Sequence, residues 1–198
     1  MIELPASPAP ASVSPELMDY GVVLRPGLGG AVQKVDRAGS RYRVAFTYPP
    51  MPADDARKFV SRLNQAKLEG GLRMKMRLAG IDQSGAGSPV VDGAGQAGTL
   101  LSIRGLTPGY ALQEGFWLTI FDASGQPYLH NCRSEVTADG SGDAAIVITP
   151  PLRIDFADGA TIELNAPVVE GFIDGGAIGW SVDTAYHFGI GFTIEEAA

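Results

Sequence analysis

Cysteine and histidine are the side chains best suited to nucleophilic catalysis or metal binding, and this sequence contains few of them. Cys132 is the single cysteine, and the two histidines are His130 and His187. His130 and Cys132 lie two positions apart, so on a strand they would share one face, as a thiolate–imidazole pair requires. A cysteine in such a strand is more often a small core residue, and no Gly-x-Ser-x-Gly elbow is present. We therefore expect no catalytic residues and no enzymatic activity.

Two glycine-rich segments are similar to the sequence motifs of ligand-binding loops but lack the spacing or the flanking elements that such loops require. Residues 139–143, Asp-Gly-Ser-Gly-Asp, lack the ligand spacing and the closing Glu of a calcium loop, so we interpret them as a hairpin turn. Residues 93–98 match a Gly-x-Gly-x-x-Gly fingerprint, but a strand pattern follows them where a dinucleotide site needs a helix. Because the two histidines are also far apart, the sequence predicts no metal and no cofactor.

A hydrolase and a carbohydrate-binding module are the functional alternatives that the sequence leaves open. A β fold could bring together two of the 22 acidic residues, as glycoside hydrolysis requires, but nothing singles out a pair. Trp117 and Phe121 share the parity of one strand pattern, so they could form an aromatic patch on one face of a sheet. Trp in such a strand is more often part of the core.

The charged residues are divided unevenly along the chain. Residues 17–80 carry twelve of the fifteen Lys and Arg residues against five acids, a net +7, and residues 81–198 carry three against fifteen, a net −12. These charges could simply be solvated on the surface. However, Arg73, Lys75 and Arg77 alternate along one predicted strand and would therefore form a basic stripe on one of its faces. The residues between them are Met instead of the aromatics on which bases stack, and the whole chain is acidic, so we expect no specific nucleic-acid sequence as a partner. We predict that this basic stripe contacts another subunit.

Alternating patterns predict strands at both ends of the chain. Residues 41–48 and 72–78 place apolar side chains at every second position, as half-buried strands do. Residues 178–194 have apolar side chains at nearly every even position. We predict one long strand there, kinked at its glycines, which returns to complete the first sheet. Between the first two strands, residues 52–69 have apolar side chains at helical spacing, followed by a Gly-Gly pair that ends a helix.

The fold class that follows is all-β with one α-helix. We predict a discontinuous β-sandwich made of residues 17–80 and 173–196, with a small β-barrel or sandwich of residues 88–172 inserted into it. The inserted part follows a connector rich in Gly, Ser and Asp, and turn signals recur between its short strands. Residues 1–16 contain four prolines, and we expect them to form an extended arm outside the core that lies across a neighbouring subunit.

The cellular setting is indicated by what the sequence lacks. One cysteine cannot form an internal disulfide, which agrees with assembly in a reducing cytoplasm. No apolar run approaches the roughly 20 residues of a membrane span, and the N-terminal residues lack the basic and apolar regions of a secretory signal. We expect no membrane insertion.

An ordered series of motifs is similar to a known family. The series comprises Met18-Asp19-Tyr20, the turn-rich segment 25–30, the strand 41–48 running into Pro49-Pro50-Met51, the helix ending in Gly70-Gly71, and then segments 93–101, 112–116 and 150–153. In this order and spacing the chain resembles the distal tail proteins, which are tail-tip (baseplate) ring subunits of long-tailed bacteriophages and prophages. The resemblance covers roughly residues 18–196.

The resemblance implies a structural virion protein without an active site. A hexameric ring would connect the tail tube protein to the central hub or tip protein, and the virion tail tip would assemble in the host cytoplasm. In this family the β-sandwich with one helix forms the ring and a second β domain projects outward. Such rings use head-to-tail contacts, so we expect Arg73, Lys75 and Arg77 to meet acidic residues of a neighbour or of the hub. A carbohydrate-binding or host-adhesion module of a tail or cell-surface assembly is the alternative.

Overall fold

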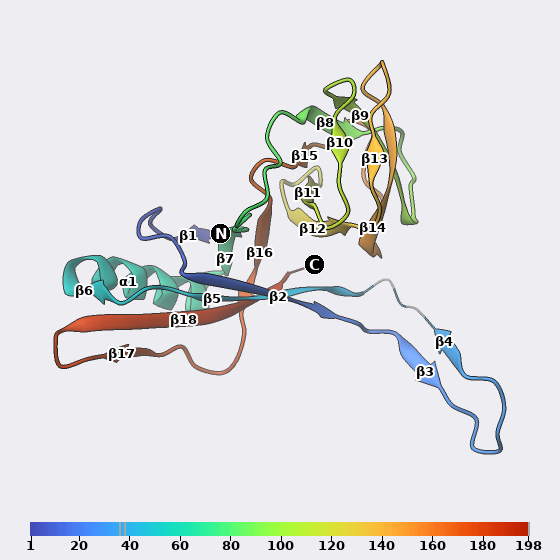
Figure 1. Ribbon diagram of the computed structural model, residues 1–198. Helices are drawn as coiled ribbons and strands as arrows, with labels where there is room; N and C mark the ends of the chain where they lie inside the picture. The colour runs from blue at the N-terminus through green and yellow to red at the C-terminus, as the bar shows by residue number, and fades with distance from the viewer. Residues whose placement is uncertain (36, 38, 198) are drawn as a thin grey trace.

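A computed structural model describes residues 1–35, 37 and 39–197, and this part of the chain is all-β with a single α-helix, as the sequence predicts (Figure 1). The first module contains the helix and the strands β1 (Ile2–Glu3), β2 (Ser12–Met18), β5 (Arg41–Thr47), β6 (Met51–Pro52), β7 (Leu72–Lys75), β16 (Val168–Ile173), β17 (Trp180–Val182) and β18 (His187–Glu196). A separate hairpin, β3 (Val22–Leu24) and β4 (Gln33–Val35), leaves this module between β2 and β5. The second module contains β8 (Gly87–Val91), β9 (Gly98–Leu106), β10 (Ala111–Leu112), β11 (Trp117–Phe121), β12 (Pro127–Cys132), β13 (Val136–Thr137), β14 (Ala144–Leu152) and β15 (Ile162–Glu163).

The helix α1 (Ala53–Glu69) has local sequence signals at both ends. Asp54 and Asp55 lie in its first turn, where the N-terminal end of the helix dipole favours negative charge. At the other end the N–H of Gly71 donates to the carbonyl of Ala66 at 2.8 Å. Gly71 has a φ of +87°, and a Cβ there would lie 2.5 Å from the carbonyl oxygen of Gly171, so only glycine fits. The buried side chains of the helix form one stripe: Ala56, Phe59, Leu63 and Ala66.

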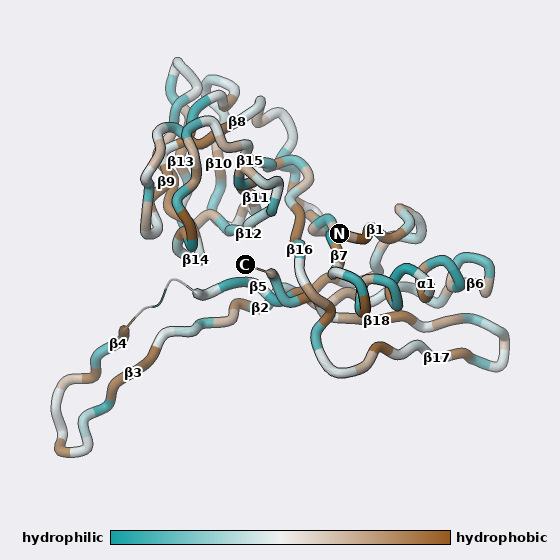
Figure 2. Tube along the Cα trace, turned by 180° about the vertical axis from the view of Figure 1, so that it is seen from behind, coloured by the Kyte–Doolittle hydropathy of each residue, from teal (hydrophilic) through white to brown (hydrophobic). Residues whose placement is uncertain are grey.

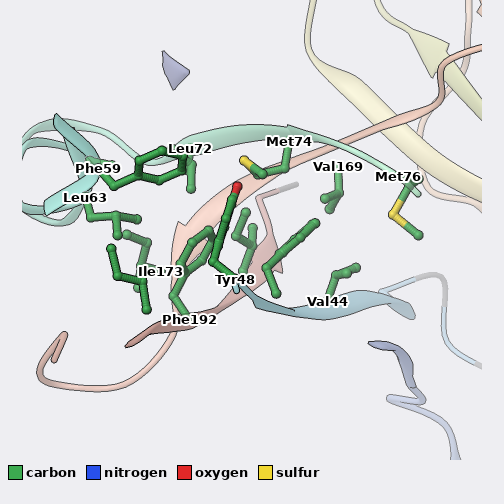
Figure 3. Close-up of a cluster of buried hydrophobic side chains, with 14 of the residues drawn as sticks. Val44, Tyr48, Phe59, Leu63, Leu72, Met74, Met76, Val169, Ile173 and Phe192 are labelled. Atoms are coloured by element: carbon green, nitrogen blue, oxygen red, sulfur yellow. The ribbon is translucent and has the colours of Figure 1, made fainter. Parts of the chain in front are cut away.

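The first module is one sheet that folds over its own core. Its strand order is β1-β7-β16-β18-β5-β2, and β6 and β17 also pair with β18. All of these pairs are antiparallel except β1 with β7. Figure 3 shows Met74 and Val169 on one side of the core and Val44 and Phe192 on the other, with Phe59 of the helix at one end. The two halves of the sheet therefore form a sandwich around shared apolar side chains.

The second module is a small, nearly closed barrel. Its six main strands follow the order β15-β11-β12-β14-β9-β8, and β10 pairs with β13 beside them. The two ends of this order meet, because Val90 bridges to Thr161 and the N–H of Val91 donates to the carbonyl of Ala160 at 2.9 Å. The barrel has its own core, which includes Leu101, Ile103, Leu118, Ile120 and Ile146.

Strand β16 lies in the first sheet, although the predicted inserted segment, residues 88–172, contains most of it. Val169 and Ile173 pack into the core of the first module. On the other side, Val168 and Thr119 of β11 exchange two hydrogen bonds, from the N–H of Val168 to Thr119 Oγ1 at 2.8 Å and from Oγ1 to the Val168 carbonyl at 2.9 Å. Because both modules bury this strand, it has no apolar–polar alternation that could assign it to one of them.

The N-terminal residues 1–16 do not leave the body as the predicted arm. Strand β1 pairs with β7, and β2 pairs with β5 along its whole length. Arg77 Nη1 holds the segment between them by donating to the carbonyls of Pro10 at 2.8 Å and Ala11 at 2.6 Å. Pro15 lies within β2, which is tolerated because β2 is the edge strand of the sheet.

The predicted long C-terminal strand is two strands joined by a turn. The Asp183 carboxylate closes this turn by accepting the N–H of His187 at 2.8 Å. The register places Trp180 opposite Ile190 and Val182 opposite Phe188. Even positions therefore face even positions, and the apolar alternation continues through the turn without a break. A pattern of period two cannot show such a reversal.

A buried carboxylate joins the two modules. Glu196 at the end of β18 is fully buried, and its Oε1 accepts hydrogen bonds from the N–H of Leu129 at 2.7 Å and from Arg153 Nη2 at 2.5 Å. Its Oε2 accepts the N–H of Tyr42 at 3.2 Å. The Arg153 guanidinium also lies over the ring of Tyr128, 5.0 Å from its centroid. One side chain of the first module thus holds a strand and a cation of the second.

We expect the variant Glu196→Ala to lower the free energy of unfolding by about 3 kcal/mol or more, because it leaves the Arg153 guanidinium buried without its anion. Urea denaturation would measure this loss. The neighbouring variant Glu195→Ala is the control, since Glu195 and its partner Arg41 are both partly exposed and its removal should cost less than about 1 kcal/mol. Equal losses in the two variants would contradict the role of the buried pair.

Candidate subunit interface

His130 and Cys132 lie on β12, and both are buried. Burial, with a further contribution from the nearby Arg153 charge, lowers the pKa of His130 to about 3. Its Nδ1 lies 2.9 Å from the carbonyl oxygen of Pro150, which can only accept, so Nδ1 carries the proton of a neutral ring. Burial also raises the pKa of the Cys132 thiol to about 12. At neutral pH this pair therefore offers neither a thiolate nor an imidazole that solvent can reach.

The stability of the fold should depend on the protonation of His130. Below pH 6.5 the unfolded chain takes up a proton at this residue that the folded chain, with its pKa near 3, does not. The free energy of unfolding should thus fall by roughly 2 kcal/mol between pH 7 and pH 5, at about 1.4 kcal/mol per pH unit below 6.5.

Urea denaturation at several pH values measures this dependence. The variant His130→Asn, whose amide can still donate to the Pro150 carbonyl, should lose most of it. The matched variant His187→Asn alters a half-exposed histidine and should keep it. An unchanged slope in His130→Asn would show that other groups cause the dependence.

Other sequence motifs with potential chemistry have structural roles. Residues 93–97 form a loop that leads into β9, which begins at Gly98. Residues 139–143 form a turn in which the Asp139 carboxylate accepts backbone N–H groups. The ring of Trp117 packs edge-on against Tyr42, with centroids 4.9 Å apart, so it lies at the junction of the modules.

Within residues 1–35, 37 and 39–197, no group of His, Cys, Asp or Glu is arranged to hold a metal ion. None of the helical structure in these ranges is long and apolar enough to cross a membrane.

Two of the three residues of the predicted basic stripe have partners within the chain. The Arg73 guanidinium pairs with the buried carboxylate of Glu170 and donates to the carbonyl of Gly125 at 2.9 Å. Arg77 holds the N-terminal segment, as described above. Lys75 is exposed and forms no ion pair with the described residues. Arg73 and Lys75 lie on β7, but this strand ends at Lys75 instead of continuing to residue 78 as predicted, so Arg77 lies beyond it. Most of the charge of the stripe is used within the chain itself.

This division predicts different effects of two neighbouring substitutions. Arg73→Met leaves the Glu170 carboxylate buried without its cation, and the free energy of unfolding should fall by about 2 kcal/mol. Lys75→Met changes an exposed side chain and should stay within about 0.5 kcal/mol of the wild type. Urea denaturation of both variants tests this, and similar values would contradict the assignment of Arg73 to the interior.

Most of the exposed large apolar side chains among the described residues lie on two hairpins. The first hairpin, residues 20–35, contains β3 and β4 and extends away from the body (Figure 1). Strand β3 is exposed on both faces and pairs only with β4, and Leu28 at the tip is fully exposed. The exposed apolar residues of this hairpin are Tyr20, Val22, Val23, Leu24, Leu28, Val32 and Val35. None of them belongs to either core.

The second hairpin, residues 178–190, contains β17, the turn and the first part of β18. Trp180 and Val182 are about half exposed, and they lie opposite Ile190 and Phe188, which pack against the first core. The apolar face of the sheet therefore continues beyond the elements that cover it. Tyr186 at the turn is 78% exposed. Figure 2 shows hydrophobic segments along both hairpins.

The fold and these surfaces define a two-module all-β protein with two projecting apolar hairpins. A scan against models of known protein families finds no match, and a search of curated proteins finds no similar sequence.

Proposed function

We propose that this chain is a structural ring subunit of the tail tip of a long-tailed bacteriophage or prophage, of the distal tail protein type. The observation that carries the proposal is the pair of exposed apolar hairpins, one formed by the separate two-stranded sheet β3–β4 and the other by β17 and β18 of the first sheet. Large exposed apolar patches mark interaction surfaces, and a subunit with two different patches can contact two neighbours. A closed ring gives every subunit these two neighbours.

The ordered motif series of the sequence supports the choice of a tail-tip ring among ring-forming proteins. The resemblance implies a β-sandwich with one helix and a second, smaller β domain, and the two modules of this chain have that composition. Six copies would form the ring, the tail tube protein and the hub or tip protein would bind its two sides, and the ring would be located in the virion.

The alternative of a carbohydrate-binding module has less support. Its candidate platform consisted of Trp117 and Phe121, but Trp117 packs against the first core and Phe121 lies beneath the guanidinium of Arg73, 5.9 Å from its ring. Both aromatic rings therefore contact the junction between the modules. A catalytic role for His130 and Cys132 is disfavoured by their burial.

Native mass spectrometry and negative-stain imaging of the purified chain test the proposal. We expect one closed oligomer with six copies, which appears as a ring. This ring should persist at moderate salt, because apolar contacts are not screened as surface ion pairs are. A chain that stays monomeric at high protein concentration and binds a sugar would overturn the proposal.

A further inference from the structure

We infer that the first hairpin of one subunit docks on the second hairpin of the next copy of this chain. The inference rests on the proposed ring and specifies the surfaces that meet in it. The partner is a second copy of the chain, because the two hairpins lie at opposite ends of the sheet and differ in apolar surface and in charge.

The positions of the hairpins fit a head-to-tail contact. The first hairpin connects to β5 at its Arg41 end, whereas β18 pairs with Thr47 at the other end of β5 and continues from there into the second hairpin. Figures 1 and 2 show the hairpins extending from opposite ends of the sheet. Contacts between opposite ends of successive subunits are heterologous, and such contacts close into a ring by rotation. A contact of like hairpins would instead produce a twofold dimer.

The apolar surface of each hairpin could cover the exposed apolar surface of the other. The second hairpin has an uncovered continuation of the core face, with Trp180 and Val182 exposed. The first hairpin is a two-stranded ribbon, which has little stability by itself and needs a surface on which to pack. It carries Val23 on one face and Val22 and Leu24 on the other, so it can cover a neighbour with either face.

The charges of the hairpins also differ in sign. The first hairpin carries Arg25, which has no hydrogen bond or ion pair with the described residues, and Lys34, which pairs with Asp19 at 3.0 Å. The second hairpin contains Asp183, which accepts N–H groups within its own turn and lies 3.6 Å from His187, and it contains no Lys or Arg. Opposite charges favour the contact of unlike hairpins and disfavour the contact of two first hairpins.

Tyr186 has a backbone conformation that suits glycine better than tyrosine. Its φ of 61° lies in the left-handed region, where an L-residue is disfavoured by about 1 kcal/mol. The turn therefore presents a large aromatic ring at a cost to its own stability. Tyrosine is enriched among the residues that contribute most to protein–protein binding, so Tyr186 is well placed to contact the docked hairpin.

A mixing experiment tests the inference. One variant, Val23→Glu with Leu28→Glu, disables the first hairpin, and the other, Val182→Glu with Tyr186→Glu, disables the second. Each should be monomeric alone. Mixed in equal amounts, they should form a 1:1 dimer that grows no further, because only one intact pair of unlike hairpins remains. Analytical ultracentrifugation measures the masses.

Controls separate this inference from the ring itself. Leu68→Glu with Leu100→Glu alters two exposed leucines outside the hairpins and should leave the ring intact. If the wild type and this control form rings while the mixture stays monomeric, or if either hairpin variant alone still forms rings, the hairpin contact is overturned and the ring proposal stands. A wild type that does not associate overturns both.

Tyr186→Gly provides a variant that should not impair folding. Glycine tolerates the left-handed conformation, so the melting temperature of the dissociated subunit should stay the same or rise. The dissociation constant of the subunit contact should nevertheless increase about tenfold or more. An unchanged dissociation constant would remove Tyr186 from the interface.

Discussion

The arrangement of the two modules depends on the buried carboxylate of Glu196. A buried anion is tolerated only when donors surround it, and here the donors come from β5, from β12 and from Arg153. Because these segments are far apart in the sequence, the carboxylate can be satisfied only when both modules are in place. The Arg153 cation that pairs with Glu196 also adds to the effect of burial in lowering the pKa of His130.

The sequence predicts best the elements whose signals are local. The helix lies within one residue of its expected start, and the alternation in β5 and β7 corresponds to the observed burial. Such local signals cannot predict hydrogen bonds and ion pairs between residues that are distant in the sequence. Arg73 pairs with Glu170, and Arg77 donates to the N-terminal segment. No periodic pattern in the sequence indicates that these distant residues are in contact. Strand β16, in which every residue except Phe172 is buried, has no apolar–polar alternation that would assign it to a module.

The predicted interface residues also show that local sequence patterns do not reveal which side chains the fold leaves exposed. An alternating basic stripe stands out in a sequence, whereas an exposed hairpin does not, because exposure depends on the absence of a covering element. One signal was available: Val22-Val23-Leu24 and Val32 flank the turn-rich residues 25–30, and this apolar run does not alternate. An apolar run without alternation usually indicates burial in a core. Here it belongs to an exposed two-stranded ribbon that packs into neither core.

The two edges of the first sheet determine whether copies of this chain can pair with one another sheet to sheet. Unprotected edges recruit further strands and lead to aggregation, and proteins commonly block them with proline, charge or very short strands. One edge here is β2, which contains Pro15 and Glu16, and the other is the two-residue strand β1. Both edges are therefore protected against pairing with the sheet of another copy, whereas the two hairpins stay exposed.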